Sequence, residues 1–413
     1  MRIAVFTPSH NPGFLNDAYR SLCEQTLTDW EWIVVLNGDA GEWAPSTPDA
    51  RVKVSRAESA KGVGAAKAVA CEGAVGDILV EFDHDDLLAP TCLQEVHDAF
   101  AAHPEAVLVY SDFAQINDDL SPNHERFSSA SGWEYDDQQI NGTTYLRCRA
   151  MAPSPHNVSY IWYAPNHVRA FRRDAYEAVG GYDRGLEVLD GQDLMMRLYA
   201  LGDFHHIPHC LYLQRMHPTN TQRDPATNRF IQEQTVRFYQ ERIDGIVAAW
   251  SSRHGLGRLT LTTPTSPPVS DHDPGEVIVI DPGAVRLELP DSSVGVITVT
   301  DILQRIPDRA AFFNECYRVL VHGGLIVSTT PSTDGRGAFQ DPSHIAFYNE
   351  NSFWYLTQSH LHFAIPTLYA RFQISHIRTH FPSEWHQQNN IPYVHANLLA
   401  IKDGARQGGA LLC

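Results

Sequence analysis

An apolar run that ends in a group of acids is the feature that most constrains the fold of this chain. Residues 78–82 read Ile-Leu-Val-Glu-Phe, and Asp83, Asp85 and Asp86 follow almost at once. A short apolar run of this kind is typical of a buried strand. The carboxyl ends of strands in an open α/β sheet border its ligand crevice. Acids gathered there are costly without a positive partner, so the stretch predicts a site for a cation or for a ligand with hydroxyl groups.

A structural alternative is that Asp85 or Asp86 only caps a following helix, since Pro90 stands near a plausible first turn. Capping needs one acid, whereas this stretch holds three. In an extended segment Asp83 and Asp85 point to one side and His84 to the other, so the two acids could converge on one ligand. We therefore expect a binding site, in which Asp86 is the acid that could serve only as a cap.

Short strands alternate with helices in the first part of the chain. The alternation predicts an α/β fold with a mainly parallel open sheet, whose loops after residues 7, 36 and 82 line one crevice. The predicted strands are residues 3–7, 32–36, 52–54 and 78–82, and the predicted helices include residues 62–70.

Length and charge narrow the class of protein further. A chain of 413 residues is too long for one ordinary core and suggests two domains. Its formal net charge of -18, with no run of Lys or Arg, makes nucleic acid an unsuitable partner. No apolar run approaches the roughly 20 residues that span a bilayer, and the N-terminus reads directly as a strand. Seven cysteines without a C-x-x-C pair favour reduced thiols, so we expect a cytoplasmic protein without a membrane span.

Several motifs occur in a fixed order over residues 1–250. They are Thr7-Pro8-Ser9-His10-Asn11, residues 21–26, residues 29–38, the small-residue segment 62–68 and the acidic stretch 83–86. In this order they resemble the family 2 glycosyltransferases, in which an A-type glycosyltransferase fold uses nucleotide-sugar donors. The resemblance implies a nucleoside diphosphate-sugar as donor, with a UDP-sugar first among the candidates, and a carbohydrate or another hydroxyl compound as acceptor.

The same resemblance implies roles for individual residues. Where the family commonly has an Asp that binds the donor base, this chain has Asn37, whose amide both donates and accepts hydrogen bonds. A late segment around His217 resembles the family's Arg-x-His motif, in which the His can reach the donor's metal. The implied donor-binding residues are Thr7, Pro8, Asn11, Asn37, Lys67, Asp83 and His84. The implied ligands of a divalent metal, Mn²⁺ or Mg²⁺, are Asp85, Asp83 and His217.

Residues 189–198 resemble the family's Glu-Asp-x-Asp-Leu-x-x-Arg-Leu helix, which carries the general base. The alignment leaves two carboxylates available, because one register places the usual catalytic Asp on Gly191. We favour Asp193 over Asp190 as the base. The structural alternative is that both are helix-start acids stabilised by the helix dipole.

The last third of the chain reads as a separate unit. Residues 256–275 have the Gly, Pro and Thr content of a linker between a first domain, residues 1–255, and a second, residues 276–413. Segments such as 289–294 and 315–324 resemble the later half of Rossmann-like S-adenosylmethionine-dependent methyltransferases. No strand with a Gly-x-Gly loop is evident before Val277, so we expect a truncated, inactive domain to which S-adenosylmethionine is unlikely to bind. We expect this second domain to have a structural, dimerising or acceptor-binding role, and through it the chain could form a homo-oligomer.

These features together predict an inverting, metal-dependent glycosyltransferase that acts on a polysaccharide or glycolipid precursor. Two alternatives stay open at this point. One is a non-catalytic scaffold or binding protein, and the other is a bifunctional glycosyltransferase-methyltransferase.

Overall fold

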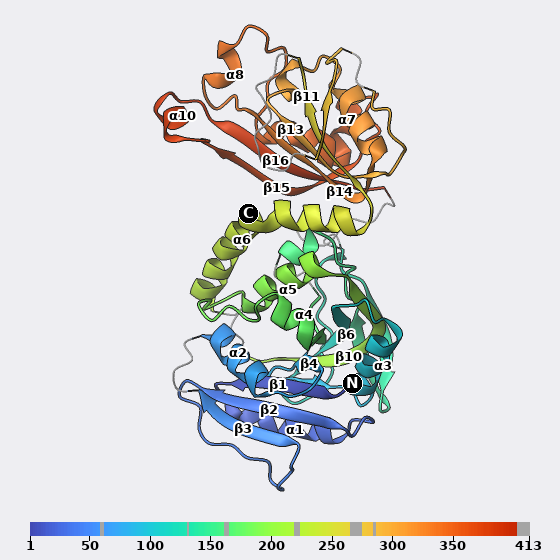
Figure 1. Ribbon diagram of the computed structural model, residues 1–413, viewed down its shortest axis with the longest axis vertical. Coiled ribbons are helices and arrows are strands. Elements are labelled where there is room, and N and C mark those ends of the chain that lie inside the picture. The colour runs from blue at the N-terminus through green and yellow to red at the C-terminus, as the bar shows by residue number, and fades with distance from the viewer. Residues whose placement is uncertain are drawn as a thin grey trace. The chain divides into compact units, whose positions relative to one another are not determined.

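The chain forms two compact units, Met1–Ile246 and Val247–Cys413, and both are drawn in Figure 1. The boundary falls within helix α6 (Pro225–Arg253), a few residues before the predicted boundary at residue 255. None of the described helices has the length and apolar content that a membrane crossing requires. The computed structural model describes residues 1–57, 62–129, 132–160, 165–218, 224–264, 275–283 and 286–402.

A large sheet forms the centre of the first unit, with the strand order β3-β2-β1-β4-β9-β6-β10-β5 (Figure 1). Strands β1 to β4 run parallel, as the alternation of strands and helices predicts. Strand β9 lies antiparallel between β4 and β6, and β6 pairs in parallel with β10. The bounds are β1 Ile3–Ser9, β2 Trp30–Asn37, β3 Val52–Ala57, β4 Ile78–Glu81, β5 Leu87–Leu88, β6 Leu108–Asn117, β7 Tyr135–Ile140, β8 Thr143–Cys148, β9 Arg169–Arg172 and β10 Phe204–Met216.

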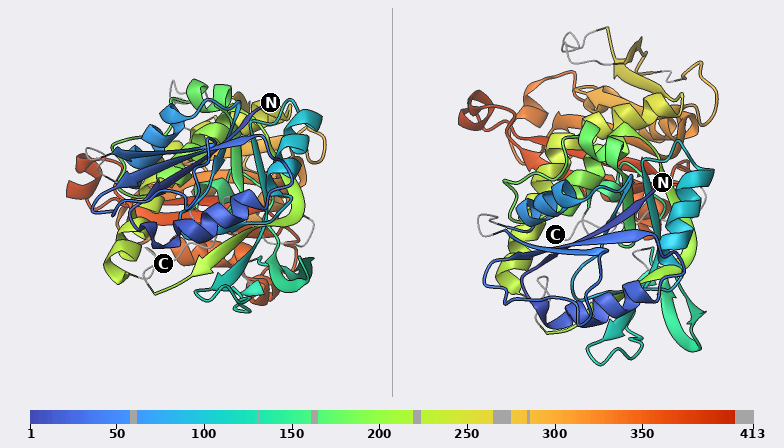
Figure 2. Two further views of the ribbon diagram at one scale, coloured as in Figure 1. Left: turned by 90° about the horizontal axis from the view of Figure 1, so that it is seen from below. Right: turned by 60° about the horizontal axis from the view of Figure 1, so that its bottom comes forward.

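Helices cover both faces of this sheet. Figure 2 shows α1 and α2 on opposite sides of the first strands. Side chains of β1 alternate accordingly, with Val5 in the core beneath α1 and α3, and Ala4 and Phe6 in the core beneath α2, α4 and α5. Because both faces are buried, these strands are apolar throughout, which made them visible in the sequence. The bounds are α1 Leu15–Cys23, α2 Val63–Gly73, α3 Cys92–Ala102, α4 Arg173–Ala178 and α5 Asp190–Leu201.

The second unit holds a smaller sheet with the order β12-β11-β13-β14-β16-β15. Strands β12, β11, β13 and β14 are parallel, and β16 and β15 add an antiparallel edge. This is the Rossmann-like α/β class that the sequence predicts. The bounds are β11 Gly257–Thr262, β12 Glu276–Val279, β13 Val294–Thr300, β14 Leu320–Pro331, β15 Phe372–His380, β16 Tyr393–Ala400, α7 Arg309–Val319, α8 Gly337–Gln340, α9 Trp354–Thr357 and α10 Glu384–Gln388.

One prediction about this unit is wrong in part. Residues 257–262 lie in the predicted linker, but they form β11, a central strand that pairs with β12 and β13. Leu259 and Leu261 are buried in the core of the unit, and Thr260 between them points to the other face. The surrounding Gly, Pro and Thr content hid this two-residue alternation. Residues 265–274 of the predicted linker lie outside the described residues.

Candidate functional site

A cleft of about 300 Å³ opens at the carboxyl ends of β1, β2 and β4. The loops that follow these strands all contribute to its wall, as expected for an open α/β sheet. Helices α2 and α6, the start of α5 with the loop before it, the start of β9 with the residues before it, and the end of β10 supply the rest. The predicted residues that line the cleft are Pro8, Asn11, Asn37, Lys67, Asp83, His84, Asp85, Asp190 and His217.

Thr7 lies beneath the cleft and does not line it. Its side chain is fully buried and donates a hydrogen bond of 2.7 Å to the carbonyl oxygen of Phe82. The indole Nε1 of Trp32 donates to the same hydroxyl at 2.8 Å. Thr7 therefore links β1 to its two neighbouring strands beneath the cleft. Its position within the strand directs its side chain away from the loop that lines the cleft.

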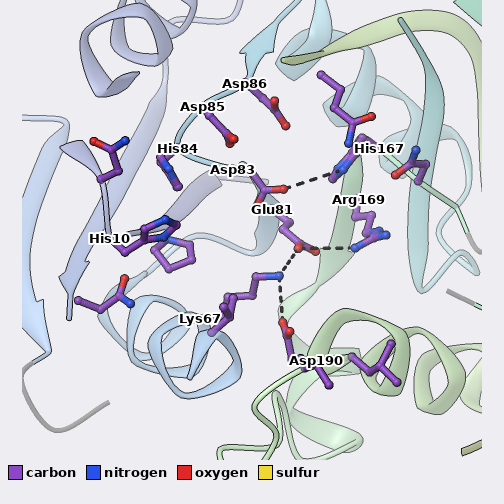
Figure 3. Close-up of a pocket in the computed structure, with 18 of the residues that line it drawn as sticks. His10, Lys67, Glu81, Asp83, His84, Asp85, Asp86, His167, Arg169 and Asp190 are labelled. Carbon is purple, nitrogen blue, oxygen red and sulfur yellow. Dashed lines mark hydrogen bonds and ion pairs between the residues drawn. The ribbon is translucent and has the colours of Figure 1, made fainter. Parts of the chain in front are cut away.

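The acidic loop after β4 joins several elements of the first unit. The Oδ2 atom of Asp85 lies 2.8 Å from the Nε2 atom of His217, at the end of β10. The Oδ2 atom of Asp83 lies 3.9 Å from the Nε2 atom of His167 (Figure 3). Asp86 is buried and accepts a hydrogen bond of 2.7 Å from the backbone N–H of Arg215.

The alternative that Asp85 or Asp86 caps the next helix is wrong. Helix α3 begins at Cys92, and its N-cap residue is Thr91. The two-residue strand β5 lies between the acids and that helix. The acids are therefore free to act as a group, because the chain pairs with β10 before it turns into α3.

Burial, together with the charges of neighbouring carboxylates, raises the pKa values of Asp83 and Asp86 in this loop. Burial, and then the charges of Glu81 and Asp85, raise the pKa of Asp83 to about 7. Burial, and then the charges of Asp85 and Asp83, hold the pKa of Asp86 well above its ordinary value. A divalent cation would relieve this repulsion, so the loop fits a metal site. Among the described residues, potential ligand atoms of Asp83, Asp86 and His167 lie within 4.8 Å of one another.

A buried ion network lies at the base of the cleft, where Figure 3 shows Lys67 between Glu81 and Asp190. The Nζ atom of Lys67 is 2.6 Å from a carboxylate oxygen of Glu81 and 2.9 Å from one of Asp190. Arg169 lies 3.6 Å from Glu81, and the Tyr182 hydroxyl donates to Glu81 at 3.1 Å. Burial alone would raise the pKa of Glu81, but Lys67 and Arg169 outweigh it and lower that pKa to about 2.

Asp193, the favoured base, lies outside the cleft. Its side chain is 1% exposed and forms ion pairs with Arg197, one turn along α5, and with Arg242 of α6. Asp190 is the carboxylate of this pair that reaches the cleft, because it stands at the first position of α5, where the helix meets the cleft wall. The sequence left open which of these two acids is the general base, and in the structure only Asp190 lines the cleft.

Several lining residues were not among the predicted site residues, and Glu81, His167 and Arg169 are three of them. Glu81 carried a usable signal, because a carboxylate inside an apolar strand must find a buried cation. His167 and Arg169 reach the cleft only because β9 inserts next to β4. Nothing in their local sequence indicates that pairing.

The comparisons with known proteins agree with this architecture. Residues 4–180 match the protein family described as "Glycosyl transferase family 2", and residues 244–328 match the family described as "Methyltransferase domain". Residues 4–180 are therefore similar to the family 2 glycosyltransferases, and residues 244–328 to a methyltransferase domain. Both resemblances drawn from the motifs are confirmed.

Curated relatives are similar over part of their length. The O-antigen biosynthesis protein RfbC of Myxococcus xanthus is 27% identical over 225 residues, which are 52% of this chain and 16% of that protein. Chondroitin synthase of Escherichia coli is 20% identical over 53% of this chain and 29% of its own length. A probable S-adenosylmethionine-dependent methyltransferase of Mycolicibacterium smegmatis is 37% identical over 63 residues, 14% of this chain and 24% of its own length. This chain thus spans less than a third of each of these relatives.

Solved structures with similar folds are more distant. S. aureus TarS 1–349, in complex with UDP-GlcNAc, has a TM-score of 0.41 and 14% identity, and the match covers 61% of this chain and 73% of that chain. The mannosyltransferase PcManGT from Pyrobaculum calidifontis, in complex with GDP-Man and Mn²⁺, has a TM-score of 0.40 and 16% identity, with 62% and 76% covered. Residue roles are not transferred at this level of similarity.

Proposed function

We propose that the first unit is an inverting, metal-dependent glycosyltransferase that moves a sugar from a nucleoside diphosphate-sugar to an acceptor hydroxyl. The observation that carries the proposal is the single cleft in which the loops after β1, β2 and β4 meet an acidic loop and the start of α5. The family match over residues 4–180 supports the same reaction class.

The charge of the cleft supports a requirement for a divalent cation. Among the described residues its lining holds six carboxylates, against the permanent charges of Lys67 and Arg169. The anionic diphosphate of a donor would be repelled by this surface unless a cation lay between them. When bound, Mn²⁺ or Mg²⁺ supplies positive charge that stabilises the leaving diphosphate. The six carboxylates are Glu81, Asp83, Asp85, Asp86, Glu187 and Asp190.

Two sets of side chains in the cleft can hold the cation, and each combines acids of the loop after β4 with a histidine from another part of the first unit. The first is the pair Asp85 and His217, with Asp83 beside it, as the family resemblance implies. The second is Asp83 and Asp86 with His167, whose potential ligand atoms already converge. Both combine hard carboxylate oxygens with an imidazole, a donor set that suits Mn²⁺.

Asn37 is proposed to bind the base of the donor. It lines the cleft at the end of β2, and its Oδ1 atom is buried with no hydrogen-bond partner among the described residues. An unpartnered buried acceptor is costly and would be satisfied by an N–H group of a bound base. The N3–H of uracil presents such a donor, so a UDP-sugar is the first candidate. Pro8, Asn11 and His84 lie in the same wall of the cleft.

Asp190 is proposed as the general base. Its carboxylate lines the cleft that holds the acidic loop, and Lys67 holds it at the start of α5. It would accept the proton of the acceptor hydroxyl as that oxygen attacks the anomeric carbon from the face opposite the diphosphate. This direction of attack inverts the configuration at that carbon. A name concerned with O-antigen biosynthesis among the relatives supports a polysaccharide or glycolipid precursor as acceptor.

The second unit is proposed to lack methyl transfer. Residues 263–275, which connect β11 to β12, contain no glycine before Gly275 and several prolines. Rossmann-like sites commonly use glycine in the loop after the first strand, because glycine lets the backbone approach the cofactor closely. Calorimetry of the full chain with S-adenosylmethionine tests this directly, and measurable binding would support the bifunctional alternative. Self-association through this unit stays a prediction that sedimentation can check.

The experiment that tests the proposal is thermal unfolding of the full chain with UDP, with and without Mn²⁺. Ligand binding to the folded state raises the melting temperature in proportion to the free energy of binding. We expect stabilisation by UDP that requires Mn²⁺. A non-catalytic scaffold with a degenerate cleft would show no shift with any nucleoside diphosphate.

A further inference from the structure

We propose that Lys67 is a positioning residue, which holds the Asp190 carboxylate directed into the cleft, and that it does not act mainly as a donor-binding side chain. This inference rests on the proposed role of Asp190 as the general base. It changes the role that the family resemblance implies for Lys67, because the charge of Lys67 is already committed to two protein carboxylates.

The burial of Lys67 requires both of its partners. Its side chain is 8% exposed, and an ammonium group at that depth is costly unless carboxylates surround it. Burial alone would lower the pKa of Lys67, but Asp190 and Glu81 outweigh it and raise that pKa. Glu81 has its own second cation in Arg169, so the four side chains form a neutral set. Asp190 is the member of this set at the start of α5.

The close approach of α2 to α5 is built into the sequence. A Cβ atom at Gly64 would lie 2.7 Å from the carbonyl oxygen of Asp183 and 3.0 Å from the Cβ atom of Asp190. Only glycine allows this contact without a shift of the backbone. Gly64 lies one turn before Lys67 in α2, so the contact brings the Lys67 side chain within reach of Asp190.

The charges around Asp190 give Lys67 a direct effect on catalysis. Lys67 faces it from α2, and Arg169 from β9 lies near Gly191. Other titratable groups near Asp190 are Glu81 of β4, Asp83 of the acidic loop, Glu187 of the loop before α5, and the Tyr182 hydroxyl. Most of these are acids, so without Lys67 the Asp190 carboxylate would face mainly repulsive charge and lose the cation that holds it toward the cleft.

The test compares Lys67→Met, which keeps the length of the side chain, with Lys67→Arg, which keeps the charge. The probe is hydrolysis of whichever UDP-sugar the unmodified protein consumes, starting with UDP-GlcNAc, measured as kcat and KM. For Lys67→Met we expect kcat to fall by at least about tenfold, because the proposed base is no longer held in place. KM for the donor should change little, and Lys67→Arg should keep kcat near that of the unmodified protein.

An unchanged kcat in Lys67→Met would overturn the inference, and so would an equal loss of kcat in Lys67→Arg or a large rise in KM alone, which would indicate donor binding. Thermal unfolding and Mn²⁺-dependent UDP binding establish that the variants fold. Should Lys67→Met fail to fold, Lys67→Gln, which also removes the charge, carries the test with Lys67→Arg as its charge-retaining control. Full turnover by Asp190→Asn would instead refute the proposed base itself.

Discussion

Asp85 and His217 meet across the cleft, with 2.8 Å between Oδ2 and Nε2, and so join the loop after β4 to the end of β10. The ring of His217 stacks on that of Phe14 at a centroid distance of 5.1 Å, which fixes its orientation. A carboxylate and an imidazole held in this way can serve as two ligands of one cation.

The two proposed sets of metal ligands predict loss of Mn²⁺ affinity in different variants. If Asp85 and His217 hold the cation, His217→Ala should weaken Mn²⁺ binding by at least about tenfold, and His167→Ala should weaken it far less. Electron paramagnetic resonance of free Mn²⁺ in a titration of the full chain measures both. The reverse order would assign the cation to Asp83, Asp86 and His167. An unchanged affinity in both variants would contradict either set.

Asp190 and Asp193 should respond differently to the same substitution. Asp190→Asn should lower kcat by about 10²–10⁴-fold because the base is lost, with UDP affinity and melting temperature nearly unchanged. Asp193→Asn should cost about 3 kcal/mol of unfolding free energy, because Arg197 and Arg242 lose their shared carboxylate. Donor turnover and urea unfolding of the two variants, measured side by side, form a matched pair. Normal stability with no turnover in Asp193→Asn would restore Asp193 as the base.

Asn37 should control affinity for the base and leave the metal unaffected. Asn37→Ala removes the buried acceptor, and we expect UDP affinity to fall by about tenfold, which corresponds to one hydrogen bond to a buried group. Mn²⁺ affinity of the same variant is the internal control, since Asn37 is the last residue of β2 and the acidic loop follows β4. Equal UDP binding by both proteins would remove Asn37 from the donor site.

Glu81 should make the stability of the protein depend on acid. Its folded pKa of about 2 lies below the ordinary 4.5, so the stabilisation is present above about pH 4.5 and is lost as the pH falls toward 2. The contribution at neutral pH is on the order of 3 kcal/mol. Urea unfolding of Glu81→Gln and the unmodified protein should differ most at pH 7 and converge as the pH falls to about 2. The exposed Glu134→Gln is the control, and a gap that persists in acid would contradict the assignment.

The parts of the fold that could be predicted are those with a local signal. Strands β1, β2 and β4 are apolar along their length because both faces are buried, and each ends in a polar loop that the sequence identifies. Strand β11 was missed because its alternation is short and lies in a segment rich in Gly, Pro and Thr. In this segment the Gly, Pro and Thr content indicated a linker and masked the alternation of buried and exposed side chains.

Only the site residues in loops that follow the parallel strands could be predicted to lie together. The acidic loop and Asn37 could be placed in one crevice because parallel strands end at one edge. The choice between Asp190 and Asp193 could not be made, since the two acids are three residues apart in the same helix and differ only in what packs against them. Lys67 was placed near the donor, but its pairing with Glu81 and Asp190 depends on the tertiary contact at Gly64.

The most direct test of the central claim is release of UDP from a panel of UDP-sugars by the full chain, with Mn²⁺ and then with excess EDTA. We expect release from at least one donor that stops when the metal is removed and is absent in Asp190→Asn. Proton NMR of the sugar product should find its anomeric configuration inverted. Failure to bind or consume any nucleotide-sugar in the presence of Mn²⁺ would contradict the claim and favour a scaffold role for this chain.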